Sequence, residues 1–337
     1  MTATLTVVIP CYRLATRLPL TLASLARAID DRVELLFVDD ASPDATADVL
    51  EAALPRLPRA RLHRLDQNLG LSGARNAGAA LAETDYLTFF DGDDTVVRDY
   101  FPALLDAIAG LGVPMIRTDH IEVTGRDRVL RRVPAGCRDG RIEAAREAIL
   151  PVGQRTAVDY PYAWAGAYHR SLAEAGTLRF PDALRTAEDR PWIWQLHLGA
   201  EAFSVPGLAG VHYHRDQPGS LTRLADSTQL DFVAAMEQVI RIVRADPDAE
   251  RFLPKAVRRW CELTLHHLGR MERFAPEVRR TFRLLLGRAL AGAPQPFLND
   301  TLADLTPDRR NRLTRLMADA ANPADRQART EPERRAR

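Results

Sequence analysis

Short apolar runs alternate with amphipathic stretches along the first third of the chain. Runs rich in β-branched and aromatic residues predict strands, and stretches with apolar residues at every third or fourth position predict helices. Strands are expected at Leu5–Ile9, Val33–Val38, Arg61–Leu65 and Tyr86–Phe90. Helices are expected at about 17–29, 44–53, 72–82 and 99–110. This alternation favours a mostly parallel, doubly wound sheet.

The pattern changes twice further along the chain. Four more strands are predicted at Val113–Thr118, Tyr160–His169, Phe203–Pro206 and Gly210–His214. Between them we expect an exposed loop or β-excursion at 124–141 and a short helix at 142–150. We also expect a turn that enters a helix at 184–198. From Ser227 onward the pattern is helical, at roughly 227–245, 250–272, 276–291 and 307–320. The sequence therefore predicts an α/β domain at 1–225, a helical region at 226–321 and a disordered polar tail at 322–337.

The composition suits a globular protein and excludes several classes. The chain has 337 residues, is 46% hydrophobic and 27% charged, and carries a net charge of +1, so no global field favours nucleic acid. Cys11, Cys137 and Cys261 are too far apart in sequence to support a disulfide framework or a zinc site, and they fit a reducing, cytoplasmic location. The N-terminus shows no signal-peptide pattern, and no apolar run approaches the roughly 20 residues of a membrane span.

Three carboxylates follow the fourth predicted strand directly, in Asp91-Gly92-Asp93-Asp94. Aspartate and glycine cannot continue the strand, so the carboxylates emerge together at its C-terminal end. Oxygen ligands of this kind suit Mg²⁺ or Mn²⁺, which share their coordination with water and substrate phosphates. An isolated acidic turn could simply be solvated, so the rest of the sheet edge decides between the two interpretations.

Other polar residues are expected at the same sheet edge, because the C-terminal ends of parallel strands face one crevice. The first strand ends in Pro10-Cys11-Tyr12-Arg13, and the second ends in Asp39-Asp40. The glycine-punctuated segment 68–76 opens a helix and lets the backbone approach a ligand closely. An aromatic ring, arginines, carboxylates and exposed amides together suit a nucleotide diphosphate.

Five segments in chain order resemble the family 2 glycosyltransferases with the GT-A fold: VVIPCYR, VDDASPDAT, NLGLSGARNAG, YLTFFDGDD and TAEDRPWIW. The resemblance implies an α/β fold with a GT-A type, doubly wound mixed sheet (Rossmann-like), followed here by the helical region. It also implies an inverting transferase of hexosyl or N-acetylhexosaminyl type. Such an enzyme uses Mn²⁺ or Mg²⁺ to move a sugar from a nucleotide-diphosphate donor, usually UDP-linked, to a hydroxyl acceptor. The stretch LRFPDALRTAEDRPWIW also resembles members that build cell-surface polymers such as wall teichoic acid.

The resemblance assigns roles to the residues that match these motifs. It implies donor binding by Pro10, Tyr12, Arg13, Asp40, Arg75, Asp91, Gly92 and Arg215. Among these, Asp40 would accept the uracil imide N–H. Asp93 is expected to be the direct metal ligand, with Asp91 as a ribose or water-mediated metal contact. Asp94 remains open, and Asp44 is expected to cap a helix instead.

In the Glu188-Asp189 pair, the resemblance implies that Asp189 is the general base and that Glu188 orients it or touches the acceptor. An ordinary helix start would also show acids followed by Pro191.

On a strand, His212 and His214 would share one face, so either could complete the metal shell, although a buried structural histidine is an equal alternative. The resemblance places Trp164 on the floor of the acceptor site, whereas Trp192 and Trp194 are expected in the core.

The helical region is basic, since residues 251–290 hold nine arginines and one lysine against three glutamates, a surplus of seven. Such a stretch is usually a solvated helix face. It could also hold an anionic polymer acceptor or rest against the inner face of a membrane. Its apolar stripes favour core packing, and homo-oligomerisation through these helices is an alternative.

Two other enzyme classes fit the sequence less well. A sugar-nucleotide pyrophosphorylase normally has a glycine-rich first turn with arginine and lysine, but the only lysine of this chain is Lys255. A dinucleotide-binding dehydrogenase would need G-x-G-x-x-G after the first strand. The non-enzyme alternative is a regulatory sugar-nucleotide binder, against which the joint presence of Asp91, Asp93 and Asp189 argues.

Overall fold

The structure, a computed structural model, describes residues 2–134, 138–215 and 226–321. The chain forms two compact units, Met1–Leu221 and Thr222–Arg337. The predicted domain boundary after residue 225 falls at the edge of the stretch 216–225, which is not described. The predicted disordered tail, 322–337, lies outside the described residues.

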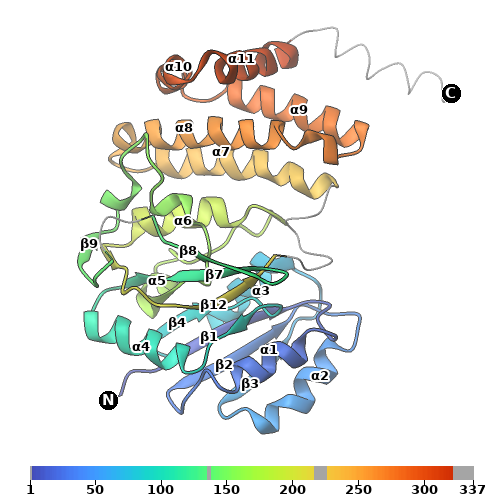
Figure 1. Ribbon diagram of the computed structural model, residues 1–337, viewed down its shortest axis with the longest axis vertical. Coiled ribbons are helices and arrows are strands. Elements are labelled where there is room, and N and C mark those ends of the chain that lie inside the picture. Colours follow the sequence, from blue (N-terminus) through green and yellow to red (C-terminus); the bar gives the residue numbers. More distant parts are fainter. Residues whose placement is uncertain (1, 135–137, 216–225, 322–337) are drawn as a thin grey trace, which may run out of the picture. The chain divides into compact units, whose positions relative to one another are not determined.

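The first unit is built on an eight-stranded mixed sheet with the order β3-β2-β1-β4-β10-β6-β11-β9 (Figure 1). Its strands are β1 Leu5–Cys11, β2 Val33–Asp39, β3 Ala60–Arg64, β4 Tyr86–Phe89, β6 Met115–Arg117, β9 Ile142–Ala144, β10 Gly166–His169 and β11 Ala202–Ser204. Strands β3, β2, β1 and β4 are parallel, whereas β10 is antiparallel to β4 and β6. The α/β class and the four N-terminal strands predicted from the sequence are confirmed.

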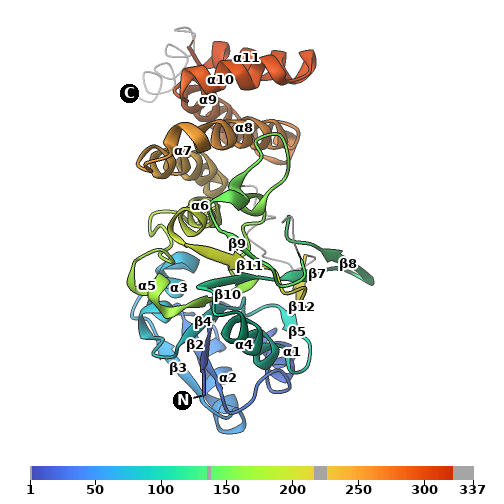
Figure 2. The ribbon, with the colours of Figure 1, turned by 90° about the vertical axis from the view of Figure 1, so that its left-hand side faces the viewer.

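Helices cover both faces of this sheet. They are α1 Leu18–Leu25, α2 Thr46–Ala53, α3 Gly70–Leu81, α4 Tyr100–Leu111, α5 Arg170–Glu174 and α6 Asp189–Gly199. Figure 2 shows α1 and α4 on one side of the sheet and α3 and α5 on the other. Every residue of β1 is therefore buried, which explains why its sequence is continuously apolar instead of alternating.

A second, four-stranded sheet of the same unit has the order β5-β12-β7-β8. Its strands are β5 Thr95–Val96, β7 Asp119–Thr124, β8 Asp127–Arg131 and β12 Ala209–His214. Strand β12 runs parallel to β7, and β7 turns back into β8 as an antiparallel hairpin. All five residues of β8 are exposed, so the β-excursion predicted within 124–141 is this hairpin.

Two local predictions are wrong. The short helix expected at 142–150 is strand β9 followed by a 3₁₀ turn, because β9 pairs with the distant strand β11. The strand expected at Tyr160–His169 is shorter in the structure, where β10 begins only at Gly166 and ends at His169. The Arg117 guanidinium donates to the carbonyl oxygens of Tyr160 (2.9 Å) and Tyr162 (2.8 Å), and these bonds take the place of strand pairing.

The second unit is helical. Its helices are α7 Asp231–Arg244, α8 Ala249–Leu268, α9 Pro276–Ala291, α10 Gln295–Asp304 and α11 Pro307–Ala321. The sequence did not predict α10, in which only Leu298 and Thr301 are buried, so its apolar signal is weak. Within the described ranges, no helix has the length and apolar character that crossing a bilayer requires.

The packing of α3 against the sheet generates a stability prediction. A Cβ added at Gly78 would lie 2.2 Å from Cγ1 of Val8 and 3.2 Å from Cγ2 of Val38. We therefore expect Gly78→Ala to lower the free energy of unfolding by about 1–3 kcal/mol through overpacking, measured by urea denaturation. Gly110 of α4 has no atom within 4 Å of such a Cβ, so Gly110→Ala should stabilise by about 0.5–1 kcal/mol. Equal effects at the two positions would refute this account of α3 packing.

Candidate active site

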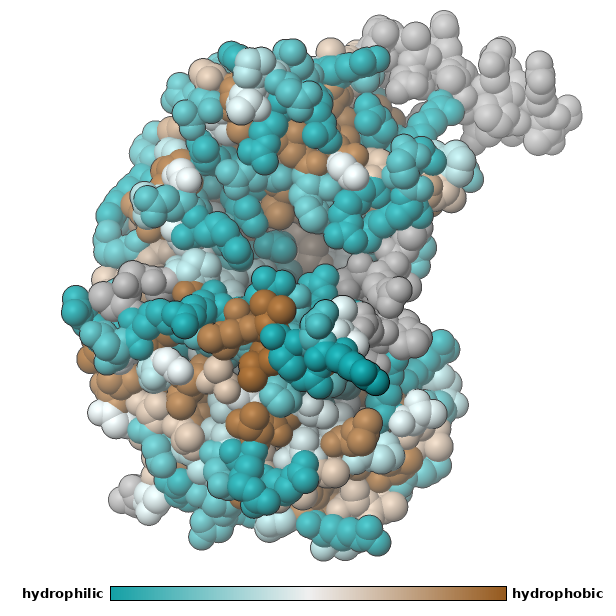
Figure 3. All heavy atoms as spheres, in the orientation of Figure 1, coloured by the Kyte–Doolittle hydropathy of each residue, from teal (hydrophilic) through white to brown (hydrophobic). Residues whose placement is uncertain are grey.

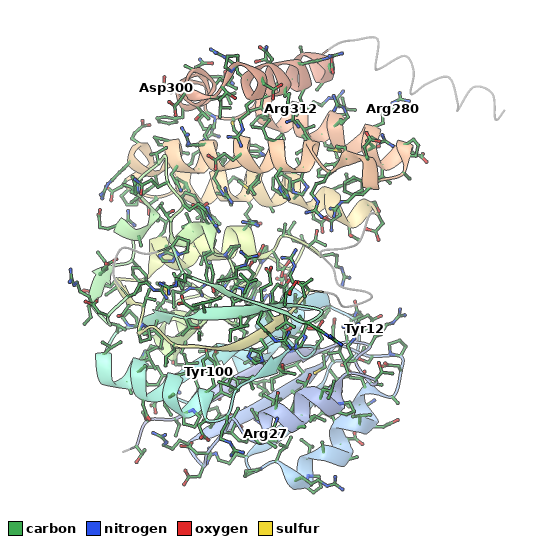
Figure 4. The ribbon with its side chains drawn as sticks, in the orientation of Figure 1. Tyr12, Arg27, Tyr100, Arg280, Asp300 and Arg312 are labelled. Atoms are coloured by element: carbon green, nitrogen blue, oxygen red, sulfur yellow. The ribbon has the colours of Figure 1, made fainter. Side chains whose placement is uncertain are left out.

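The turn after β1 lies beside the turns after β2 and β4. The amide of Asp40 donates to the carbonyl of Cys11 (2.9 Å), which joins the ends of the first two strands. Tyr12 is 40% exposed beyond the end of β1 (Figure 4), with the Arg13 guanidinium 5.3 Å from its ring centroid. An exposed ring beside an arginine is the arrangement expected for a nucleotide base and its phosphates.

Asp40 has a structural role that the sequence did not reveal. Its carboxylate accepts from the amides of Leu69 (2.6 Å) and Gly70 (2.8 Å) and from the side-chain amide of Asn68 (2.8 Å). Gly70 has a φ of +77°, which favours glycine, and it opens α3. Asp40 therefore holds the segment that the sequence singled out as glycine-punctuated, and its oxygens already have donors.

The Asp91–Asp94 turn is pressed against the turn after β1. A Cβ at Gly92 would lie 2.7 Å from Cδ1 of Leu14 and 3.0 Å from the Pro10 carbonyl oxygen, so a larger residue here would require both neighbours to shift. The Thr21 hydroxyl, which donates to the carbonyl oxygens of Gly92 (3.1 Å) and Asp94 (2.9 Å), fixes the turn from α1. Close approach thus places the acidic turn directly beside the predicted base-binding turn.

The three carboxylates of this turn differ in their surroundings. Burial and the neighbouring Asp91 raise the pKa of Asp93 to about 6, although Arg17, 3.6 Å away, opposes this shift. Asp94 is 1% exposed, and burial raises its pKa well above the usual range. It accepts from the His214 amide (2.8 Å), and its other oxygen has no partner among the described residues. The turn therefore holds crowded carboxylates that additional positive charge would stabilise.

Arg75 joins this turn to the Glu188-Asp189 pair. Its guanidinium donates to Asp91 (2.7 Å) and to Glu188 (3.1 Å) and lies 5.1 Å from the Phe180 ring centroid. The Arg75 side chain is only 4% exposed. Two acidic motifs nearly a hundred positions apart in the sequence thus share one buried cation.

Asp189 is the first residue of α6, with its side chain 29% exposed and 3.8 Å from Nε of Arg190. Burial raises the pKa of Asp189, and burial together with the Asp189 charge raises the pKa of Glu188. A partly exposed carboxylate with a raised pKa is a suitable proton acceptor. Trp192 and Trp194 of α6 are both buried, which confirms that they belong to the core.

The two histidines of β12 lie beside the acidic turn. The backbone of His214 bonds Asp94, and its Nε2 lies 3.0 Å from the Thr95 hydroxyl. His212 pairs with Thr95 in the neighbouring strand. Burial lowers the pKa of both imidazoles, so they are neutral and retain a nitrogen lone pair at neutral pH.

Trp164 is a buried member of an aromatic cluster. It is 3% exposed and packs against His120, Tyr162 and Tyr213, so it offers no open ring face to a sugar. The half-buried rings of Tyr162 and Tyr213, 5.9 Å apart, are the more accessible members of this cluster. The sequence analysis missed both tyrosines, although Tyr213 stands between the two histidines it singled out.

Arg215 follows β12 and lies on the same side of the strand as Tyr213. Its guanidinium is 3.7 Å from Glu122 and 5.8 Å from the Tyr213 ring centroid, and it remains partly exposed.

A metal ion fits the acidic turn through one or two carboxylates. In the described part of the chain, no group of three or more histidine, cysteine, aspartate or glutamate side chains could hold a metal ion by itself. Mg²⁺, however, is usually bound by one or two carboxylates plus waters and substrate phosphates, so such a group is not required. The raised pKa of Asp93 and the unpartnered oxygen of Asp94 are consistent with a site that binds a cation.

Comparison with known proteins gives a consistent result. Residues 6–158 match the family described as glycosyl transferase family 2. The succinoglycan biosynthesis protein ExoO of Rhizobium meliloti is 30% identical over 310 residues, which cover 88% of this chain and 82% of ExoO. The uncharacterized glycosyltransferase EpsJ of Bacillus subtilis is 28% identical over 67% of this chain and 64% of its own length.

Among solved structures, residues 1–349 of TarS from S. aureus in complex with UDP-GlcNAc align with a TM-score of 0.74 at 19% sequence identity. The alignment covers 94% of this chain and 88% of that one, and it shows a shared GT-A fold. The chain is therefore an enzyme of glycosyl transferase family 2, which uses a nucleotide-sugar donor.

Proposed function

We propose that this chain is an inverting, metal-dependent glycosyltransferase that moves a sugar from a UDP-sugar to a hydroxyl of a cell-surface polysaccharide or glycolipid. The observation that carries the proposal is the Arg75 bridge. The Arg75 guanidinium binds both Asp91 and Glu188. Asp91 lies beside the candidate metal ligand, and Glu188 lies beside the candidate base. A donor sugar bound between the two acidic motifs would have its leaving phosphate on one side and its attacking acceptor on the other.

The donor side uses the three turns at the sheet edge. Tyr12 would lie against the base, Arg13 would meet the diphosphate, and Arg215 would add a planar donor fork. Asp40 supports this surface by fixing the segment that opens α3. The UDP class is favoured because the TarS structures are described as complexes with UDP and UDP-GlcNAc.

Asp93 and Asp91 would hold Mn²⁺ or Mg²⁺, with His214 and His212 as candidates for a further ligand. When bound, the ion would neutralise the charge that develops on the departing diphosphate. The neutral state of both histidines suits ligation, and the Thr95 hydroxyl already orients the His214 ring.

The acceptor side is built around Asp189. Asp189 would remove the proton of the acceptor hydroxyl as its oxygen attacks the anomeric carbon, and Glu188 would position it while paired with Arg75. Tyr162 takes the place predicted for Trp164, because the Asp189 charge acts on it and its ring is half-exposed. A cell-surface polymer is favoured as acceptor by the names of two relatives, a succinoglycan biosynthesis protein and a poly(ribitol-phosphate) β-N-acetylglucosaminyltransferase.

The central experiment measures nucleotide release and sugar transfer with UDP-, GDP- and dTDP-sugars, for the unmodified chain and for Asp189→Asn. We expect UDP-sugars to be the substrates and Asp189→Asn to reduce transfer about 10²–10⁴-fold with UDP affinity nearly unchanged. Asp48→Asn, which alters an exposed carboxylate of α2, should change neither quantity. A parallel loss of UDP affinity and transfer in Asp189→Asn would remove its role as base.

The metal assignment predicts a conditional effect at Asp93. Asp93→Asn should weaken UDP binding when Mn²⁺ is present and leave it unchanged in excess EDTA, because the carboxylate acts on the nucleotide through the ion. Titration calorimetry under both conditions checks this. If the variant binds UDP with the same Mn²⁺ dependence as the unmodified chain, Asp93 is not the ligand.

The bridge itself predicts a loss of stability. Arg75→Met leaves Asp91 and Glu188 close together without their shared cation, and we expect the free energy of unfolding to fall by about 3–5 kcal/mol. Arg179→Met is the matched control, because Arg179 is 65% exposed and pairs only at the surface with Asp182. It should cost at most about 1 kcal/mol in the same urea titration. Similar losses in the two variants would mean that the bridge does not organise the site.

A further inference from the structure

The β7–β8 hairpin exposes two adjacent apolar side chains. Val129 is 43% exposed and Leu130 is 46% exposed, and as neighbours on a strand they lie on opposite faces of the hairpin. Every other large, exposed apolar side chain among the described residues stands alone in the sequence. Figure 2 shows β8 extending outward from the rest of its unit. In Figure 3, a brown patch flanked by teal side chains lies where Figure 1 places β8.

The hairpin is also strongly basic. Residues 125–132 contain four arginines and one aspartate, a surplus of three positive charges. Arg131 pairs with Glu122 (2.7 Å), which reduces the surplus to two. Arg128 donates to the carbonyl oxygens of Gly125 and Asp127 and to no carboxylate among the described residues.

Two roles can explain exposed arginines on a strand at the edge of a sheet. Charged side chains prevent such a strand from pairing with another chain. That role accounts for the arginines but not for Val129 and Leu130, because exposed apolar residues favour pairing. Apolar side chains flanked by arginines are instead typical of elements that bind an anionic lipid surface.

We propose that the β7–β8 hairpin docks on an anionic lipid surface. Leu130, which lies on the same face of β8 as Arg128, enters the headgroup region, Val129 lies at the margin of the contact, and Arg126, Arg128 and Arg132 meet the lipid phosphates. The surface differs from the basic helices considered in the sequence analysis, since it lies in the sheet-containing unit. It also goes beyond the proposed transfer reaction, because lipid binding requires neither donor nor acceptor.

Strand β7 of the hairpin pairs with β12 of the candidate site, so docking of the hairpin also affects where the site lies relative to the lipid surface. Strand β7 pairs with β12, where Val123 lies opposite His214 and Glu122 lies opposite Tyr213. Docking of the hairpin therefore brings the Tyr213 and Arg215 side of the site close to the lipid surface.

The test is sedimentation of the full chain with vesicles of phosphatidylcholine, alone or mixed with phosphatidylglycerol. The chain should bind only the mixed vesicles. Arg126→Glu/Arg132→Glu should lower the partition coefficient about tenfold or more. Arg27→Glu/Arg56→Glu makes the same change in net charge at exposed positions away from the hairpin and should retain binding (Arg27 is labelled in Figure 4).

A second pair of variants tests the apolar contribution. Val129→Ser/Leu130→Ser should also weaken vesicle binding, whereas Leu20→Ser, at a side chain that is 74% exposed, should not. UDP affinity, measured on the same samples, should stay unchanged in all variants and shows that the fold is intact. The proposal is overturned if the chain binds no mixed vesicles or if hairpin and control variants lose binding equally. It is also overturned if the hairpin binds soluble polygalacturonate and not vesicles, which would identify an anionic glycan as its partner.

Discussion

The buried guanidinium of Arg75 is the interaction on which the candidate site depends. A cation with 4% exposure has lost nearly all of its water, and this cost is offset only if carboxylates meet it with good geometry. Asp91 comes from the turn after β4 and Glu188 from the start of α6, so one guanidinium holds both segments. The chain cannot satisfy Arg75 without bringing the turn after β4 and the start of α6 together. The requirement of one residue therefore fixes the relative position of the two acidic motifs.

A second constraint, the close approach of backbones, acts on the other side of the same turn. Gly92 lies against the Pro10 carbonyl, so the acidic turn cannot move away from the turn after β1 without opening a gap in the core. Arg75 thus joins the Asp91–Asp94 turn to α6, while Gly92 packs the same turn against the end of β1. Burial, with the neighbouring carboxylates adding to it, raises the pKa of Asp93 and of Asp94. Positive charge placed beside this turn would therefore favour the ionised carboxylates.

The sequence predicted the features that depend on local pattern. Largely apolar runs identified the parallel strands β1, β2 and β4, because burial on both faces removes any alternation. The acidic motifs could be recognised because their residues are adjacent in the chain. What the sequence could not show depends on distant partners: strand β9 exists because β11 pairs with it, and Asp40 binds a segment almost thirty residues away. The burial of Trp164 could not be predicted for the same reason, since it results from a cluster contributed by three separate strands and loops.

The small sheet connects chemistry and surface binding through the alternation of its side chains. On β12, Tyr213 and Arg215 lie on one face, while His212 and His214 lie on the other, beside Asp94 and Thr95. Glu122 of β7 lies opposite Tyr213 and is shared by Arg215 and by Arg131 of the hairpin, so one carboxylate links Arg215 to β8. Both arginines lower the pKa of Glu122, which keeps it charged across the physiological range. Arg131 of the hairpin and Arg215 beside the site therefore share one ion-paired carboxylate.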